Sequence, residues 1–468
     1  MLFQSPHFAL FFAGVVVGVW LLPNRTWRHA ALLVASYVFY AAWDPRFLTL
    51  IWASTAIDFF VGRRLAASAD RKARKRWLAL SVTANLGILG VFKYLDFFAT
   101  SAAALADAFG VTLSPVTLDL VLPVGISFYT FQSMSYTIDV YRGRIPPEPS
   151  ALRFALYVAF FPQLVAGPIV RARTFLPQLA RDRRPRGADL APGALLFAIG
   201  LFKKIAMADR FGAFADPVFA APELWSAPAL LAAAGAYTAQ IYCDFSGYSD
   251  MAIGLGRILG YRLPRNFDRP YSATSLRAFW RRWHISLSSW LRDYLYISLG
   301  GNRSGPLRTA RNLFLTMLLG GLWHGAAWTF LLWGAWHGAV LGLERAVRRR
   351  ARAAVRRWRP AWGWAVTMSA VVAGWVVFRV EALPDAERFA RAIASWSPGV
   401  EALAPGPSLG VALLFGLFCF GQTPASARLE RSILRLGPTA KMACAGAGIA
   451  LAHALSLGGQ RVFIYFQF

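Results

Sequence analysis

Long apolar windows recur along almost the whole chain and are separated by short polar loops. Most windows are long enough to cross a hydrocarbon core of roughly 30 Å as an α-helix. We therefore predict an all-α, polytopic integral membrane protein with about eleven transmembrane helices. The windows lie near residues 8–22, 29–43, 46–61, 78–99, 119–139, 192–207, 227–242, 312–343, 361–378, 408–420 and 438–457.

One apolar stretch, residues 160–187, does not have the pattern of a continuous helix. Pro162, Gly167, Pro168 and Pro177 interrupt it, and a proline removes a backbone donor and kinks a helix. Broken backbone at membrane depth must be shielded by protein or line a cavity, because lipid offers its polar groups no partner. We predict a re-entrant element here.

Composition agrees with a membrane protein and narrows the expected partners. Of the 468 residues, 57% are hydrophobic and 15% aromatic, and the formal net charge is +27. Such a charge suggests nucleic acid, but the Lys and Arg residues stand mostly in short loops between apolar windows, as the positive-inside rule requires. We therefore expect contacts with membrane lipids and no nucleic acid. No internal repeat or long linker is visible, so residues 1–468 are expected to form one integral membrane domain.

Two loops rich in Lys and Arg, residues 62–77 and 345–359, set the expected orientation. Both should be cytoplasmic. Counting spans outward from these loops puts the N-terminus and the C-terminus on the side opposite the cytoplasm. No Lys or Arg precedes Arg25, so the first apolar window lacks the basic start of a cleaved signal peptide and is expected to remain as a span.

The three cysteines, Cys243, Cys419 and Cys444, are far apart and form no C-x-x-C pair. Two of them stand inside apolar windows, where a free cysteine behaves as a small hydrophobic residue. We therefore expect all three to act as small packing residues and expect no metal site.

The segment GGLWHGAAWTFLLWGAWHG, residues 320–338, repeats Trp-His-Gly within a long run that has no Lys, Arg, Asp or Glu. On a continuous helix, His324 and His337 would stand about 140° apart around the axis and about 20 Å along it. They could not then share one proton or one metal ion. The run is too long for one untilted span, which predicts a tilt or a break at Gly320-Gly321.

The two histidines of this repeat are expected to differ in role. An ionisable group deep in a membrane is a functional candidate by default. His324 lies well inside the apolar run, beside the expected break, whereas His337 lies nearer to the basic loop 345–359. We assign His324 as the candidate catalyst and His337 as a packing residue.

A third histidine, His284, stands in a segment that predicts an amphipathic helix at the membrane interface, residues 275–303. Two interpretations remain open. In the first, Arg281 and Arg282 hold lipid phosphates and His284 only packs. In the second, the helix presents His284 at the cytoplasmic mouth of a cavity whose inner end is His324.

Several blocks of the sequence, taken together and in order, resemble the membrane-bound O-acyltransferase family, and within it the bacterial alginate O-acetyltransferase group. The resemblance runs from about residue 8 to residue 468, with its core motifs in residues 122–343. The blocks are LPVGISFYTFQSMSYTIDVYRG (122–143), FFPQLVAGPIVR (160–171), IYCDFSGYSDMAIGLGRILGYRLPRNFDRPY (241–271), FWRRWHISLSSWLRDYLYISLGGNR (279–303), NLFLTMLLGGLWHGAAWTFLLWGAWHG (312–338) and the terminal FIYFQF.

The resemblance implies a bowl-like helical fold with a central tunnel and transfer of an acyl group to a hydroxyl. It also implies the bacterial inner membrane, so the charge pattern predicts that both termini are periplasmic. The family's invariant histidine corresponds to His324, and the second polar position of its active site corresponds to His284. The implied donor is cytoplasmic acetyl-CoA, without a metal. Arg281 and Arg282 are candidates for its phosphates, although lipid headgroups would suit them equally.

His324 suits this chemistry in either of two ways. A thioester is already activated, so the enzyme mainly has to deprotonate a hydroxyl, and a neutral imidazole is a suitable general base. The competing mechanism is a covalent acyl-imidazole on the same residue.

Two aspartates need partners. Asp244 lies in a membrane run, where a carboxylate requires a cation, and Arg281 or Arg282 is the expected one. Asp293 is expected to pair with Arg292 or a neighbouring basic residue.

The final residues carry an F-x-Y-x-x-F pattern, formed by Phe463, Tyr465 and Phe468. It resembles the C-terminal motif of acyl-relay peptides that work with family members in teichoic-acid D-alanylation, where the tyrosine carries the acyl group. One interpretation is an aromatic anchor at the membrane interface. The other is that Tyr465 enters the tunnel from outside, is deprotonated by His324 and accepts the acetyl group.

The resemblance therefore implies an O-acetyltransferase that serves an exported polysaccharide, such as alginate, through a periplasmic SGNH-hydrolase-like partner. One alternative is a family member with another acyl donor or a lipid acceptor. A second is a proton-coupled transporter, because histidine and aspartate at depth also suit proton paths. The lack of visible paired inverted repeats argues against the transporter.

Overall fold

The computed structural model describes residues 1–181, 184–303, 305–350, 360–396, 399–400, 405–458, 461 and 463–464. Most of these residues are helical. Among them, the one strand-like pairing is an isolated bridge between Trp225 and Val400. The prediction of an all-α protein is confirmed.

The helices gather into two compact units. Unit 1 consists of residues 1–194 and 252–264, and unit 2 consists of residues 195–251 and 265–468. Two helices, α10 (Gly187–Leu201) and α12 (Ala227–Ile258), contribute residues to both units. The single domain over the whole chain stays a prediction.

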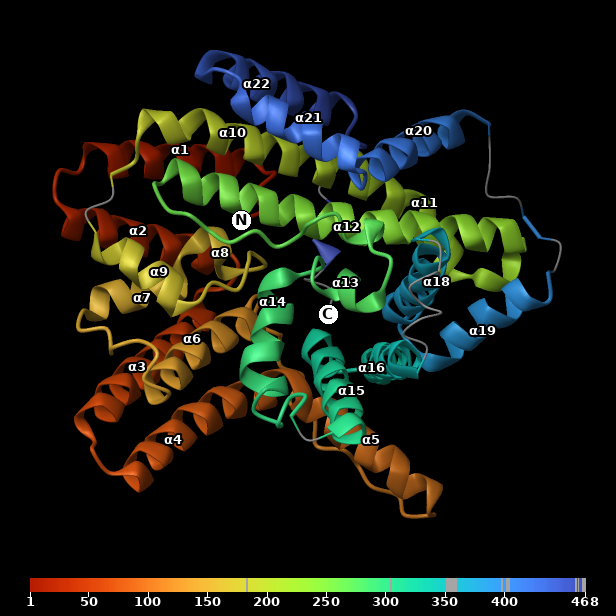
Figure 1. Cartoon of the computed structure of the whole chain (residues 1–468), viewed down its shortest axis with the longest axis horizontal. Helices are drawn as coiled ribbons and strands as arrows, with labels where there is room; N and C mark the ends of the chain where they lie inside the picture. The colour runs from red at the N-terminus through yellow and green to blue at the C-terminus, as the bar shows by residue number, and fades with distance from the viewer. Residues whose placement is uncertain are drawn as a thin grey trace. The chain divides into compact units, whose positions relative to one another are not determined.

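Unit 1 is built mainly from the first nine α-helices, with the end of α12 (Figure 1). The nine helices are α1 (Pro6–Leu21), α2 (Arg25–Ala41), α3 (Leu48–Ala67), α4 (Arg71–Leu89), α5 (Leu95–Ala108), α6 (Ile126–Tyr141), α7 (Ala151–Ala159), α8 (Phe161–Leu164) and α9 (Ala172–Ala180).

Helices α3, α4 and α6 of unit 1 share a buried polar cluster. The Asp58 carboxylate is 0% exposed and accepts hydrogen bonds from the Ser81 hydroxyl at 2.5 Å and the Asn85 amide at 3.0 Å. The Ser54 hydroxyl donates to Asn85 at 2.6 Å and lies 3.2 Å from the Ser133 hydroxyl. A buried carboxylate needs such donors because it has lost its water.

The interruption predicted within residues 160–187 is present. Helix α7 ends at Ala159, the short α8 follows, and α9 begins at Ala172. The backbone N–H of Phe161, which begins α8, donates to the Ser36 hydroxyl of α2 at 3.1 Å. A side chain thus satisfies a backbone group freed by the break. The re-entrant path of this segment stays a prediction.

Several helices are long and apolar enough to cross a membrane. Three such stretches occur within the described ranges, at Arg71–Ala108, Gly187–Ala220 and Pro360–Arg379. A further pair, Gly410–Gly421 and Pro424–Arg435, qualifies when taken together but is bent by 80°. These helices agree with a membrane protein, and the number of eleven spans stays a prediction.

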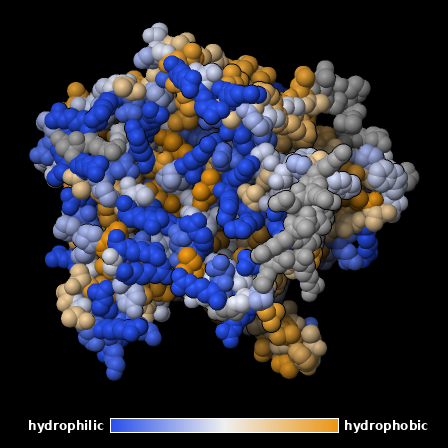
Figure 2. Space-filling model, viewed as in Figure 1, coloured by the Kyte–Doolittle hydropathy of each residue, from blue (hydrophilic) through white to orange (hydrophobic). Residues whose placement is uncertain are grey.

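Apolar surface is also exposed at the end of α5. Figure 2 shows a hydrophobic surface over this end and the segment that follows it. Leu105, Phe109 and Val116 are 63%, 78% and 76% exposed there. Exposure of such apolar side chains to water is unfavourable, and contact with lipid would cover them.

Unit 2 holds the remaining helices (Figure 1). Within it, α15 and α16 pack along each other and α18 packs against α16. Its elements, besides the shared α10 and α12, are the π-helical η3 (Phe202–Ala208), α11 (Asp209–Ala220), α13 (Leu276–Trp280), α14 (Ile285–Trp290), the π-helical η6 (Leu291–Tyr296), α15 (Gly305–His324), α16 (Trp328–Arg350), α18 (Pro360–Arg379), α19 (Leu383–Ala394), α20 (Pro405–Gly421), α21 (Pro424–Arg435) and α22 (Pro438–Ala454).

The cysteines fulfil their expected packing role only in part. Cys243 is 1% exposed in α12 and acts as a small core residue. The expectation is wrong for Cys419 and Cys444, which are both exposed. Their helices, α20 and α22, are apolar around much of their circumference, so an apolar window alone does not tell which positions face the core.

Candidate active site

Helices α15 and α16 form a hairpin whose turn directly follows His324. Residues 325–327 separate the two helices, so the break expected at Gly320-Gly321 is misplaced. Both glycines lie inside α15. A Cβ on Gly321 would stand 2.2 Å from the carbonyl oxygen of Phe330 in α16, and a Cβ on Gly320 would stand 3.2 Å from the Leu291 side chain of η6. The two glycines therefore allow close packing of α15 against its neighbours.

His324 is surrounded by aromatic rings. Its imidazole is 7% exposed, and its ring centre lies 5.1 Å from Trp323, 5.1 Å from Trp333 and 5.3 Å from Phe378. All three contacts are edge-to-face, which is a favourable geometry for aromatic pairs. The candidate catalyst thus stands at a helix end in aromatic surroundings.

His337 lies within α16 and contacts the same tryptophan as His324. Trp333 stands between the two histidines, with its centre 4.9 Å from His337, and Trp280 contacts His337 at 5.0 Å. His337 is 0% exposed. Helix α18 covers it so closely that a Cβ on Gly374 would stand 2.5 Å from its Nε2. This enclosure agrees with a packing role.

His284 does not lie on the continuous helix expected over residues 275–303. Helix α13 ends at Trp280, α14 begins at Ile285, and His284 occupies the break with φ 41° and ψ 56°. This left-handed conformation is uncommon outside glycine and costs energy. The break turns the His284 ring into the protein, where it is 1% exposed.

Asn266 holds the His284 ring in place, and this residue was not anticipated. Its Oδ1 accepts from the Ser286 backbone N–H at 3.2 Å and from the Ser286 hydroxyl at 2.9 Å, while its Nδ2 donates to Ser249 at 3.1 Å. The His284 Nδ1 lies 3.2 Å from the same Oδ1. An acceptor oxygen requires a donor, so Nδ1 carries the proton and Nε2 carries the lone pair.

Burial also affects the charge of His284. It lowers the pKa of the imidazole to about 3, because the charged form loses its hydration. The ring is therefore neutral at pH 7, and its Nε2 keeps a lone pair that can accept a hydrogen bond.

The structure brings His284 and His324 into one aromatic cluster. Trp323 stands between them, with its ring centre 6.1 Å from His284 and 5.1 Å from His324. All three side chains are buried. The two candidate histidines, 40 positions apart in the chain, therefore share one site in unit 2.

The C-terminal tail reaches the same cluster. Phe463 is 2% exposed and its ring centre lies 5.0 Å from Tyr248 and 5.8 Å from Phe245. The ring centre of Phe245 in turn lies 4.6 Å from that of His284, in an edge-to-face arrangement. Tyr465 and Phe468, the other two members of the tail motif, lie outside the described residues.

The backbone of the tail is held by a buried carboxylate. The Ile464 N–H donates to Asp244 Oδ2 at 2.7 Å. The other carboxylate oxygen of Asp244 pairs with Lys204 at 2.8 Å, and Lys204 also pairs with Asp209 at 2.9 Å. The Lys204 and Asp244 side chains are each 3% exposed. The ion pair therefore joins η3, α12 and the tail.

The partner expected for Asp244 was wrong, and the one for Asp293 was right. Arg281 is exposed, and Arg282 donates to the Ser272 hydroxyl at 2.7 Å. The cation that pairs with Asp244 is Lys204, which stands in the apolar window 192–207. A lysine in one apolar window and an aspartate in another are the sequence signal that indicates such a pair. Arg292 pairs with Asp293 at 2.7 Å, as predicted.

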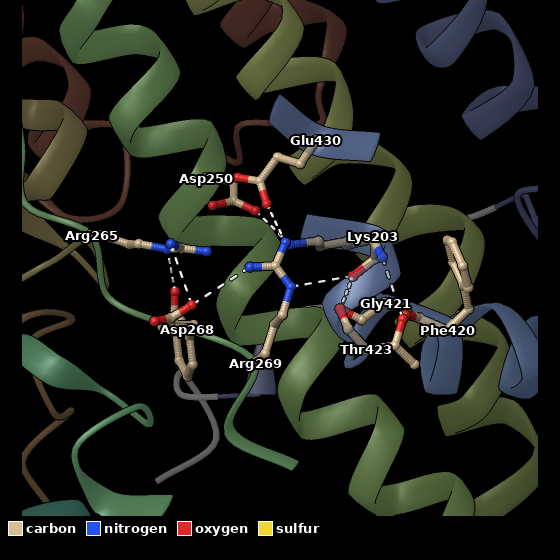
Figure 3. A network of polar contacts seen from close by, with 11 residues as sticks. Lys203, Asp250, Arg265, Asp268, Arg269, Phe420, Gly421, Thr423 and Glu430 are labelled. Carbon is tan, nitrogen blue, oxygen red and sulfur yellow. Dashed lines mark hydrogen bonds and ion pairs between the residues drawn. The ribbon is translucent and has the colours of Figure 1, made fainter. Parts of the chain in front are cut away.

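Ion pairs steady the loop that carries Asn266 (Figure 3). Arg265 pairs with Asp268 at 3.3 Å. Arg269 lies 3.6 Å from Asp268 and also pairs with Glu430 of α21. The amphipathic helix α21 is thereby tied to the loop that orients His284.

The model of the membrane-bound O-acyltransferase family matches residues 143–380, which contain His284, His324 and His337. The chain is 48% identical to the probable alginate O-acetylase AlgI of Pseudomonas aeruginosa over 399 residues. This alignment covers 85% of this chain and 75% of that protein.

The names of two other relatives give a different acceptor or a different acyl group from that of alginate O-acetylase. The chain is 37% identical to the peptidoglycan O-acetyltransferase of Helicobacter pylori, over 82% of this chain and 78% of that protein. It is 28% identical to the teichoic acid D-alanyltransferase of Bacillus subtilis, over 45% of this chain and 55% of that protein.

Proposed function

Since the chain belongs to the membrane-bound O-acyltransferase family, we propose that it moves acetyl from cytoplasmic acetyl-CoA across the bacterial inner membrane to O-acetylate an exported polysaccharide. The chain is an O-acyltransferase of a membrane. The relatives named alginate O-acetylase and peptidoglycan O-acetyltransferase support acetyl as the transferred group and a polysaccharide as the final acceptor.

One observation carries the assignment of residues: a single buried cluster contains His324, Trp323, His284 and the Phe463 end of the tail. An acyl transfer needs a base, an acceptor hydroxyl and a way to exclude water. The buried cluster supports His324 as the base, and the tail supports Tyr465 as the hydroxyl that reaches it.

The proposed first step forms an ester and breaks a thioester. His324 takes the proton of the Tyr465 hydroxyl, and the phenolate oxygen attacks the acetyl carbonyl carbon. The tetrahedral intermediate collapses with loss of the coenzyme A thiolate, which takes up the proton. His284, neutral with a lone pair on Nε2, is proposed to orient the donor through a hydrogen bond. The competing mechanism, an acetyl group carried first on His324, uses the same residues.

The hydrogen bond to Asp244 is proposed to position the acceptor. Ile464 directly precedes Tyr465, and its N–H is held by the buried carboxylate at 2.7 Å. Phe463 adds a hydrophobic contact beside His284 through Phe245. A backbone fixed one residue before the tyrosine restricts the positions of its hydroxyl and thereby lowers the entropic cost of attack.

The second step passes acetyl to a periplasmic SGNH-hydrolase-like partner and from there to the polymer. A phenol with a pKa near 10 is a better leaving group than a sugar hydroxyl. The acetyl-tyrosine ester therefore retains enough energy to acylate a serine and then a sugar.

The decisive experiment replaces only the hydroxyl of Tyr465. Membranes that contain the full chain receive acetyl-CoA labelled in the acetyl group, and the ester-linked label retained on the protein is measured. The wild type should retain label, and Tyr465→Phe should lose it while keeping the aromatic ring. Tyr141→Phe, which removes a hydroxyl in unit 1, is the matched control and should retain it. If Tyr465→Phe acetylates exported polymer at the wild-type level, Tyr465 is an anchor and the relay is wrong.

A further inference from the structure

Five arginines within the described part of the chain line one cavity in unit 1. The cavity has a volume of about 370 Å³. It lies between the residue after α9, the segment before α10 and the end of α12 with its following loop. Figure 2 shows hydrophilic residues gathered over α9 and the beginning of α10. The arginines are Arg181, Arg184, Arg186, Arg257 and Arg262.

The wall of this cavity beside α12 is rigidly built. Tyr261 is 3% exposed, and its ring centre lies 5.4 Å from that of Phe160 and 5.5 Å from that of Phe175. Gln178 of α9 holds the next residue, because its Oε1 accepts from the Arg262 N–H at 2.9 Å and its Nε2 donates to the Arg262 carbonyl at 3.0 Å. The backbone at Arg262 is therefore fixed by α9.

A glycine lets the opposite wall approach. Gly260 has φ +88°, a left-handed conformation that side chains rarely adopt. A Cβ there would stand 3.4 Å from the carbonyl oxygen of Arg184. The Arg184 side chain also donates to the Pro23 carbonyl at 3.0 Å. Segment 184–186 is thus held close to the end of α12.

The charges of the cavity are unbalanced. Among the described residues that line the cavity, Asp189 is the one acidic residue, and it accepts a hydrogen bond from the Nε of Arg257 at 3.2 Å. The guanidinium groups of this described lining repel one another unless an anion joins them. A guanidinium presents planar, forked donors that match the oxygens of a phosphate. The beginning of α10, beside these arginines, adds the positive end of its helix dipole.

We propose that this arginine cavity binds a phosphorylated ligand with at least two negative charges. Its volume falls at the lower end of the range for small-molecule pockets, roughly 300–1,000 Å³, which suits a phosphate-rich head more than a whole cofactor. The same chemistry is available from the nucleotide phosphates of coenzyme A and from an anionic lipid headgroup. The coenzyme A source rests on the proposed function, whereas phosphate binding itself does not.

The first arm of the test uses adenosine 3′,5′-bisphosphate, which has the phosphates of a nucleotide but no thioester. The full chain is reconstituted in nanodiscs of phosphatidylcholine, and the Kd is measured by calorimetry at several salt concentrations. The double variant Arg257→Gln with Arg262→Gln should bind at least tenfold more weakly and with a smaller salt dependence. The matched control, Arg303→Gln with Arg308→Gln, removes the same charge from an exposed segment and should bind within about twofold of wild type.

The second arm uses nanodiscs that also contain phosphatidylglycerol, and mass spectrometry counts the anionic lipids that stay bound. Weaker nucleotide binding in the double variant supports a donor-phosphate site, and loss of retained phosphatidylglycerol supports a lipid site. If both readouts match wild type, the proposal is wrong. His324→Ala should leave both readouts unchanged. A His324→Ala enzyme that binds phosphate normally and still transfers acetyl would refute the catalytic assignment without affecting this proposal.

Discussion

The two Trp-His-Gly segments have the same tripeptide and different surroundings. His324 ends α15 at a break, is 7% exposed and shares Trp323 with His284. His337 lies within α16, is 0% exposed and is covered by α18 at Gly374. The position in the hairpin, and not the tripeptide, separates the histidine at the helix end from the one enclosed by α18.

The physical reason is the end of a helix. Where α15 ends, the chain changes direction, so a side chain there meets residues from several segments. Within α16, the neighbouring helix packs directly over the side chain. The enclosed imidazole of His337 has no hydrogen-bond partner for either ring nitrogen within the described residues. Such a group can fill space between the helices.

The largest expected effect comes from removing the imidazole at the helix end. His324→Ala should lower acetyl transfer by about 10² to 10⁴, the usual contribution of a general base, while the protein stays folded and inserted. Turnover of labelled acetyl-CoA by the purified variant measures this. Retention of more than about a tenth of wild-type turnover would show that His324 is not the base.

An intermediate effect is expected at Asn266, which orients the second histidine. Asn266→Ala removes the acceptor at His284 Nδ1 and should lower kcat by about tenfold, because Nε2 no longer keeps its lone pair aimed at the donor. Asn266→Asp keeps an acceptor oxygen there and should recover most of the loss. Similar kcat values for Asn266→Ala and wild type would mean that the tautomer of His284 is irrelevant.

The smallest effect on activity is expected at the enclosed histidine. His337→Ala should leave kcat within about threefold of wild type, because the ring fills space and does not touch the reacting groups. It should still lower the free energy of unfolding by about 2 kcal/mol through the cavity it leaves. A loss of activity equal to that of His324→Ala would overturn the distinction between the two segments.

Sequence reasoning found the histidines and missed what holds them. His324 and His284 were recognisable because an imidazole within apolar sequence stands out and because the blocks around them resemble one family. Asn266 carried no such signal, since its role depends on a break at His284 that the helical pattern of residues 275–303 does not predict. Lys204, which pairs with Asp244, stands in the window 192–207, but the sequence alone does not distinguish it from Arg281 or Arg282 as the partner.

The sequence by itself determined the class of protein, the family, the interrupted segment within residues 160–187 and the histidine of the repeat that stands out. Each of these depends on local composition and order, which a chain carries without being folded. Only the tertiary structure decided that α15 ends at His324, that Trp323 joins the two histidines, and that the tail is bound by Asp244. Those outcomes depend on contacts between segments far apart in the chain, where close packing and buried charge outweigh local helix preference.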